Sequence, residues 1–376
     1  MKHTLTRGLW AIALTAAFTA PAVAQVVDRS DNTAYGTTSA EFLLLGAGAR
    51  GAALGGAFAA LTTDITAMYH NPAGLAQLAR PAVMVSTVRY IADTKYTWAG
   101  VAFPMGGGSS AIGFSVGSFG FGDQPVYTVE NPDGDGRVYS VSETFVSGTY
   151  GKNFSDRFSA GVSLKFISDK LGSTSAGAFA FDFGTNFHAS VGARPLRASF
   201  VIQNLGSTLQ HQGPGIETGV IPPPPLGTVP VPREAQPASF RTKEFGLPVM
   251  FRVSVALDLL SQGANRVTLL SEFTQPNNTK PGAGAGLEWA SQNLGNSGFS
   301  LAARGSYTIQ PDNQLDPGTG AGFTSQEKSG SFTSDGLALG GGIAYGKGSV
   351  KFGVDYAWRN LGPLGSTNFF SFSLGW

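Results

Sequence analysis

The stretch Ser349–Arg359, SVKFGVDYAWR, alternates bulky apolar residues with polar or small ones. Successive side chains of a β-strand point to opposite faces, so this alternation predicts a strand with one apolar and one polar face. The strands of a transmembrane β-barrel have this form, with apolar side chains toward lipid and polar ones toward the lumen. The bulky residues of this stretch are Val350, Phe352, Val354, Tyr356 and Trp358.

The same period recurs from Ala82 to the end of the sequence, most clearly in Val249–Leu259 and Phe158–Phe166. It predicts an all-β membrane protein, an antiparallel transmembrane β-barrel of about fourteen strands. Most segments are near the ~9–11 residues that a tilted strand needs to cross a bilayer. The fourteen segments are Ala82–Tyr90, Tyr96–Phe103, Ser110–Phe119, Tyr139–Tyr150, Arg157–Ile167, Ala178–His188, Arg197–Gln203, Val249–Leu259, Arg266–Phe273, Ala283–Trp289, Gly298–Thr308, Gly336–Tyr345, Ser349–Trp358 and Asn368–Trp376.

The connections between these segments alternate in length. The long ones, Gly120–Val138, Asn204–Pro248 and Ile309–Asp335, all follow odd-numbered segments. Those after even-numbered segments are short, as in Gly151–Asp156, Leu260–Asn265 and Gly346–Gly348. Outer-membrane barrels have long extracellular loops and short periplasmic turns, so the alternation predicts a periplasmic N-terminus.

The composition agrees with a barrel in a membrane. Charged residues make up 13% of the chain, against about 25% in a typical globular protein, and there are 52 Gly and 27 Phe among 376 residues. The net charge of +1 leaves no electrostatic footprint for nucleic acid. Because the chain has no Cys, it forms neither disulfides nor Cys-ligated metal sites.

The first 24 residues resemble a cleaved signal peptide. Lys2 and Arg7 provide a basic start, Leu9–Ala20 is apolar, and Ala22-Val23-Ala24 matches an A-x-A cleavage site. The alternative, an uncleaved anchor helix, is disfavoured because the apolar stretch is shorter than the ~20 residues that a span needs. Residues Gln25–Ser39 are polar and are predicted to be a loose periplasmic lead-in.

Residues 40–80 are predicted to form a short helical plug, ahead of the barrel at residues 81–376. The stretch Phe42–Leu61 is apolar enough to suggest a membrane helix. Against this, Arg50 at mid-span costs about 2.5–3.5 kcal/mol, and the glycines weaken a helix. Short helices at or inside one barrel mouth are therefore expected, where Gly and Ala allow close packing on the wall.

Several plug residues are candidates for holding or gating the lumen. Arg50 and Asp64 are charged residues of the plug. They form a salt bridge from the plug to carboxylates of the wall, or Arg50 holds an acidic ligand, or the pair is simply solvated. Asn71, Pro72 and Gly74 belong to a turn that ends the plug, and they either cap it or act as a hatch.

Two other groups of residues are assigned from the strand pattern. Phe370, Phe372 and Trp376 lie on one face of the last segment, as in the C-terminal signal read by outer-membrane assembly machinery. The charged residues of the inner faces are predicted to form a polar network in the lumen. They are Lys165, Arg252, Asp258, Glu272, Arg304, Lys351, Asp355 and Arg359.

Motifs for catalysis and cofactors are not convincing. The sequence G-x-G-x-x-G at residues 46–51 lacks the βαβ context of a dinucleotide site. The four His have no metal-ligand spacing, and no G-x-S-x-G motif is present. We therefore expect no enzymatic activity, no catalytic residues, no cofactor and no metal.

The region 40–78 resembles the N-terminal hallmark of the PorV/PorQ family of outer-membrane proteins, which are relatives of the FadL-like barrels. The resemblance continues at Gln203–Gly206, Gly286–Trp289 and Asp355–Gly362. The loop Asn204–Pro248 departs from the family pattern because it contains the Pro-rich run Ile221–Pro225. This run is either a spacer or a contact for a partner. The residues that match the hallmark are Gly48, Arg50, Ala53, Leu54, Gly55, Ala57, Asp64 and Asn71–Leu75.

The resemblance implies two functions. On the PorV/PorQ side it implies a non-enzymatic component of type IX secretion that binds cargo carrying a C-terminal signal domain, together with secretion-system proteins. The long loops would then be the contacts. On the FadL side it implies passive uptake of a hydrophobic small molecule through a gated lumen. A barrel that only supports other envelope proteins is a third hypothesis. All three place the chain in the lipid of a Gram-negative-type outer membrane.

Overall fold

The computed structural model describes residues 36–221, 234–309 and 336–376. The predicted signal peptide lies outside these residues, as do residues 25–35 of the lead-in. The proline run 222–225 and nearly all of the loop 309–335 also lie outside them.

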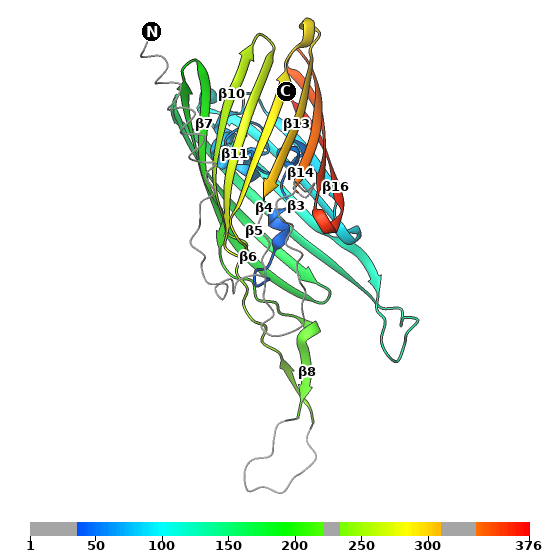
Figure 1. Ribbon diagram of the computed structural model, residues 1–376. Coiled ribbons are helices and arrows are strands. Elements are labelled where there is room, and N and C mark those ends of the chain that lie inside the picture. The colour runs from blue at the N-terminus through cyan, green and yellow to red at the C-terminus, as the bar shows by residue number, and fades with distance from the viewer. Residues whose placement is uncertain (1–35, 222–233, 310–335) are drawn as a thin grey trace, which may run out of the picture.

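Fourteen antiparallel strands form one closed barrel, which confirms the predicted fold class (Figure 1). The first strand pairs with the last from Ala82 opposite Gly375 to Arg89 opposite Asn368, and this pairing closes the sheet. The strands are β1 Ala82–Arg89, β2 Lys95–Met105, β3 Ser110–Pro125, β4 Val138–Ser155, β5 Phe158–Leu171, β6 Thr174–Val191, β7 Arg194–Gly206, β10 Met250–Gln262, β11 Asn265–Pro276, β12 Gly282–Ser291, β13 Phe299–Ile309, β14 Leu337–Lys347, β15 Val350–Asn360 and β16 Ser366–Gly375.

The two faces of the strands differ as the alternation predicts. Phe352 and Phe372 point outward and are 56% and 57% exposed, whereas Lys165 and Asp182 point into the lumen and are 1% exposed. An apolar outer surface suits hydrocarbon, and the polar groups then need partners inside the barrel. Phe370 and Trp376 of the predicted assembly signal are also exposed on the outer surface.

The two ends of the barrel carry different connections. At one end lie short turns, as at residues 156–157, 192–193 and 263–264. At the other end lie the longer connections, including the projecting hairpin of β8 (Glu217–Val220) and β9 (Gln236–Ser239) (Figure 1). We call these the short-turn end and the long-loop end. The two-residue turn between β5 and β6 is an exception, because pairing continues to Leu171 opposite Thr174. Single 3-10 turns also occur at η4 Ile91–Asp93, η5 Gly106–Gly108, η6 Pro214–Ile216, η7 Leu294–Asn296 and η8 Gly362–Leu364.

The described part of the predicted lead-in, residues 36–39, lies at the long-loop end. The Ser39 amide donates to the Gly246 carbonyl at 2.9 Å, in the connection between β7 and β10. After the plug the chain reaches the short-turn end, where Arg80 donates to the Ser349 carbonyl at 3.0 Å. The chain therefore runs the length of the lumen before β1 begins. The two predictions about orientation therefore conflict. If the short turns face the periplasm, residues 36–39 lie at the opposite mouth and are not part of a periplasmic lead-in.

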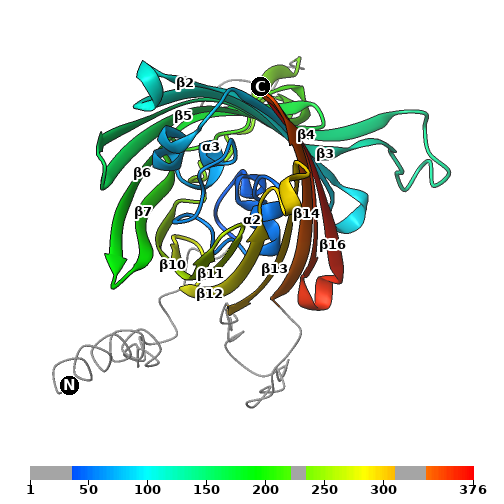
Figure 2. The same ribbon diagram turned by 90° about the horizontal axis from the view of Figure 1, so that it is seen from above.

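The plug lies inside the barrel and consists of short helical turns (Figure 2). These are η2 Glu41–Leu44, α2 Ala49–Ala53, α3 Ala67–His70 and η3 Pro72–Gln77. The helix α2 packs against β13–β16, and η3 packs against β3–β6. Between them Leu54, Phe58 and Leu61 pack on Ala256 and Leu270 of β10 and β11. None of the helices in the described ranges is long and apolar enough to cross a membrane.

Glycines of the wall allow η3 to lie directly on the strands. A Cβ at Gly161 of β5 would lie 2.4 Å from the Pro72 carbonyl carbon, and one at Gly184 of β6 would lie 2.2 Å from Asn71 Oδ1. Both distances are shorter than any ordinary contact. Residues 67–77, which we call the seated half of the plug, are therefore held by close backbone packing that only glycine permits.

Substitution Gly161→Ala is expected to destabilise the folded barrel by about 1–3 kcal/mol, because the added methyl overlaps the Pro72 backbone. Urea unfolding in lipid vesicles measures this change. The control is Gly148→Ala on β4, where the nearest side-chain atom to an added Cβ is 3.8 Å away. Equal stability of the two variants would contradict this account of the seated half.

Candidate functional site

Arg50 joins the plug to the barrel wall. Its Nε and Nη2 donate to the two carboxylate oxygens of Glu288 on β12, each at 2.8 Å. Its Nη1 donates to Oδ2 of Asp64 at 2.9 Å. The contact with Glu288 is bidentate, which is the strong geometry for an arginine and a carboxylate. Arg50 thus joins the plug to a carboxylate of the wall, and Asp64 pairs with Arg50 from within the plug.

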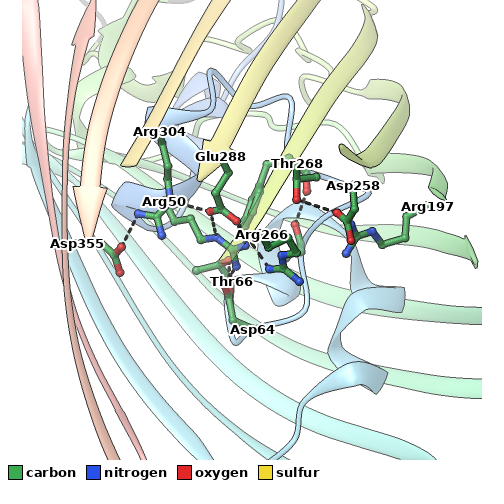
Figure 3. Close-up of polar contacts among 12 residues, drawn as sticks. Arg50, Asp64, Thr66, Arg197, Asp258, Arg266, Thr268, Glu288, Arg304 and Asp355 are labelled. Carbon is green, nitrogen blue, oxygen red and sulfur yellow. Dashed lines mark hydrogen bonds and ion pairs between the residues drawn. The ribbon is translucent and has the colours of Figure 1, made fainter. Parts of the chain in front are cut away.

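Glu288 is shared among several strands (Figure 3). Nε of Arg304 on β13 donates to it at 2.7 Å, and Nη1 of the same arginine donates to Asp355 on β15 at 2.6 Å. Nη2 of Arg266 on β11 lies 4.0 Å away. The Glu288 side chain is 1% exposed. This buried carboxylate of β12 therefore links the plug with β13 and, through Arg304, with β15.

A second group of polar contacts holds the turn after α2. Nε of Arg252 donates to Glu272 at 2.7 Å, and Nη2 donates to the Gly56 carbonyl. Glu272 accepts from the Ala59 amide at 3.2 Å. Nearby, Ser306 and Thr308 of β13 donate to the carbonyls of residues 53 and 55, at 3.0 and 3.2 Å. We call residues 46–61 the latched half of the plug, because side-chain hydrogen bonds and ion pairs hold it.

The predicted lumen residues form separate clusters rather than one network. Lys165 pairs with Asp182 at 2.7 Å and donates to Asn204 at 2.8 Å. Asp258 pairs with Arg197 and accepts from Thr268 at 2.8 Å. These clusters lie beside the Glu288 group but share no ion pair with it among the described residues.

Lys351 and Arg359 differ from the other predicted lumen residues. Neither has an ion pair or a hydrogen bond within the described part of the chain, and both line cavities of the lumen. Both side chains line the lumen, and among the described residues no ion pair or hydrogen bond holds them in place.

The turn at residues 71–75 lies at the centre of the seated half. Asn71 Oδ1 accepts from the Ala73 amide at 3.1 Å and caps η3, while Nδ2 donates to the carbonyls of Ala59 and Thr185. Pro72 begins η3 against the glycine-rich wall. A Cβ at Gly74 would lie 2.0 Å from the Thr62 carbonyl oxygen, so this position admits only glycine. In the structure the turn is a packed anchor.

Several polar partners were not among the predicted site residues, and Glu288, Asp182 and Gln203 are the main ones. Gln203 donates to the carbonyl of Tyr69, and its Oε1 accepts from Arg252 at 3.2 Å. The two-residue period of the strands predicts that Glu288 and Asp182 face the lumen. Glu288 stands between outward Leu287 and Trp289, and Asp182 stands between outward Phe181 and Phe183.

Three cavities lie along the lumen. The long-loop cavity, about 370 Å³, is mainly apolar, and Phe42, Phe119 and Phe369 contribute to its lining. The central cavity, about 220 Å³, shares Leu44, Leu45 and Arg359 with it. The short-turn cavity, about 370 Å³, is lined by charged residues that include Arg50 and Glu288. Gly51 lines the central cavity and Arg50 the short-turn cavity, so α2 separates the two.

His70 lies in the plug core and is 3% exposed. Its Nε2 lies 2.8 Å from the Ala47 carbonyl, and Gly51 and Phe58 pack against the ring. Burial, together with the positive charge of Arg252, lowers the pKa of His70 to about 3. The imidazole is therefore neutral near pH 7 and serves as an uncharged link between α3 and the chain before α2.

No group of three or more His, Cys, Asp or Glu in the described ranges is arranged to hold a metal ion. No protein-family model and no curated protein matches the chain. Solved structures do match. One is the CymD monoaromatic hydrocarbon channel, with 12% identity and a TM-score of 0.51 over 88% of this chain and 97% of that one.

Two toluene transporters have the same fold, each with 11% identity and a TM-score of 0.51. TodX of Pseudomonas putida covers 88% of this chain and 97% of its own length. TbuX of Ralstonia pickettii covers 89% and 98%. The chain therefore has the fold of FadL-like outer-membrane barrels, a closed antiparallel barrel of fourteen strands.

Substitution Glu288→Gln is expected to destabilise the barrel by about 3–5 kcal/mol, because it leaves Arg50 and Arg304 buried without their shared charge. Urea unfolding in lipid vesicles measures the loss. The matched control is Asp135→Asn, which removes the partner of Arg137 in an exposed loop and is expected to leave stability unchanged. A Glu288→Gln variant as stable as this control would show that the bridge is not stabilising.

The pH dependence of stability provides a test of His70. A histidine with a lower pKa in the folded state binds its proton more tightly when unfolded. Its contribution is complete above the unfolded pKa of about 6.5 and is lost as pH falls toward about 3. The wild type is expected to lose stability relative to His70→Gln by about 1.4 kcal/mol per pH unit in this window. If the stabilities of the wild type and of His70→Gln changed in parallel from pH 6.5 to 4, this result would contradict a buried, neutral His70.

Proposed function

We propose that the protein allows a hydrophobic small molecule to cross the outer membrane passively through the barrel lumen. The observation that carries this proposal is the long-loop cavity. Its rings and aliphatic side chains, including Phe42, Phe119 and Phe369, provide an apolar binding site beneath the long connections. Glu41, Glu143 and Arg359 are the charged residues of its lining, so an amphiphile as well as a pure hydrocarbon fits its chemistry.

The order of the cavities supports a path along one side of the plug. The long-loop and central cavities share lining residues, and the central cavity is divided from the short-turn cavity by α2. A solute that moves from one mouth to the other must therefore displace α2 or its neighbours. Beyond the long-loop cavity, the path through the central and short-turn cavities runs mainly along β10–β15, away from the part of β3–β6 on which η3 is packed.

The two halves of the plug differ in how easily they can move. The latched half is held by polar contacts, which ions and water can replace, and by the packing of Leu54, Phe58 and Leu61 on β10 and β11. Gly48 and Gly55, on either side of α2, have φ angles of +80° and +63° and can absorb large backbone changes. The seated half has no such freedom, because its backbone is in direct contact with glycines of the wall. We therefore propose that the latched half moves and that the seated half stays in place.

The similar structures favour transport over the secretion hypothesis. The similarity shows the fold alone, but the proteins named above are a monoaromatic hydrocarbon channel and toluene transporters. The PorV/PorQ resemblance, with its type IX cargo and secretion partners, rests on sequence motifs only. Transport also makes use of the apolar cavity, whereas cargo transfer on the outer loops assigns no role to it. We infer that the ligand is hydrophobic and that no enzymatic step is involved.

Uptake measurements test this function. Toluene crosses bare phospholipid quickly, so the assay needs intact cells with a lipopolysaccharide-containing outer membrane. A Gram-negative host without a hydrocarbon channel is expected to accumulate radiolabelled toluene several-fold faster when it makes this protein. Uptake equal to that of the empty host would overturn the transport proposal for this class of solute.

A reversible disulfide tests the path. The chain has no Cys, and a Cβ at Gly284 would lie 3.5 Å from Cβ of Ala57, within reach of a disulfide. The double variant Ala57→Cys/Gly284→Cys is expected to block uptake when oxidised and to restore it when reduced. The single variant Gly284→Cys is the control. Uptake that persists in the oxidised double variant would show that the latched half does not move.

A further inference from the structure

The short-turn cavity carries an excess of positive charge. Three carboxylates line it, those of Asp64, Glu288 and Asp355, against five cationic side chains, for a net charge of +2. The cationic residues are Arg50, Arg80, Arg266, Arg304 and Lys351. A partly enclosed site strengthens charge interactions relative to open water, so an excess of this kind attracts anions.

The carboxylates of this cavity are already occupied. Both oxygens of Glu288 accept from Arg50, and one of them also accepts from Arg304. Asp64 accepts from Arg50 and from Thr66, and Asp355 accepts from Arg304. The carboxylates therefore neutralise Arg50 and Arg304 and leave little negative charge to neutralise the other cations.

Arg266 is the clearest case of a cation without a sufficient partner (Figure 3). Its nearest carboxylate oxygen, on Glu288, is 4.0 Å away and already bonded to Arg50. Its Nε is buried and has no hydrogen-bond partner among the described residues. The Asp258 carboxylate on the other side is engaged by Arg197 and Thr268. A buried donor without a protein partner is costly, and an oxygen acceptor in the cavity would satisfy it.

Lys351 and Arg80 add to this excess from the rim of the cavity. Lys351 makes no ion pair or hydrogen bond within the described residues, and Arg80 donates to the Ser349 carbonyl, a neutral group. A guanidinium binds carboxylate and phosphate oxygens in a bidentate manner, and an ammonium provides a freely oriented second charge.

We propose that the short-turn cavity binds a small anion that carries carboxylate or phosphate groups, between Arg266 and the rim cations. The cavity volume of about 370 Å³ accommodates such a molecule. The site is separate from the apolar long-loop cavity, and α2 lies between the short-turn and central cavities. The inference does not rest on the proposed transport function, because it concerns an equilibrium at the other mouth.

The test uses purified full-length protein in a neutral detergent at fixed ionic strength. Succinate and inorganic phosphate are titrated by calorimetry, with succinamide as the uncharged counterpart of succinate. Saturable binding of at least one anion, at one equivalent and without binding of succinamide, is expected. Absence of saturable anion binding, or equal binding of succinamide, would overturn the proposal.

Variants locate the site. Neither the Arg266 nor the Lys351 side chain makes a hydrogen bond within the described residues, so Arg266→Gln and Lys351→Gln are expected to fold normally. Thermal unfolding checks this. Each is expected to weaken anion binding about tenfold, and the double variant more strongly. The control Lys347→Gln changes an exposed lysine at the same end that does not line the cavity, and it should bind like the wild type. Wild-type affinity in the double variant would place the anion elsewhere and contradict the assignment.

Discussion

The bidentate contact between Arg50 and Glu288 is the interaction on which the closed lumen depends. Glu288 is buried in the wall, where a lone charge is strongly unfavourable, and Arg50 belongs to a helix of only five residues that has little stability of its own. Each group therefore needs the other. Arg304 and Asp355 extend the contact to β13 and β15, so the position of α2 is determined by side chains of the wall rather than by helix propensity.

The opposite side of the plug obeys a different constraint. There the backbone of Pro72 and Ala73 touches the wall at Gly161, and the side chains of Asn71 and Pro72 touch it at Gly184, so neither wall position has room for a side chain. Close packing of this kind is lost abruptly when the surfaces separate, whereas polar contacts can be exchanged one at a time for water or ions. The contrast explains why one segment can serve both as a fixed anchor and as the barrier between cavities. It also accounts for the position of the Asn71 turn, which caps η3 and is bonded to Thr185 of the wall.

The barrel could be predicted from the sequence because lipid imposes a simple rule. Every second residue of a strand faces hydrocarbon, and segments such as Val249–Leu259 obey this rule without exception, with Arg252 and Asp258 on the lumen side. The candidate site could be predicted only in part. The period shows that Glu288 and Asp182 face inward, but pairing with Arg50 and Lys165 depends on how the barrel closes and where the plug lies. Neither is a local property of the chain. The glycines that admit η3 were visible only as composition, since their role comes from contacts between residues about 90 positions apart.

The central claim is that the latched half of the plug opens while the seated half remains in place. Hydrogen exchange of the protein in lipid, followed by mass spectrometry with and without toluene, tests this claim most directly. Amides of residues 46–61 are expected to exchange faster than those of residues 67–77, and faster still when toluene is present. Equal exchange in both halves, or faster exchange of residues 67–77, would mean that the plug moves as one body or from the other side, and it would contradict the account.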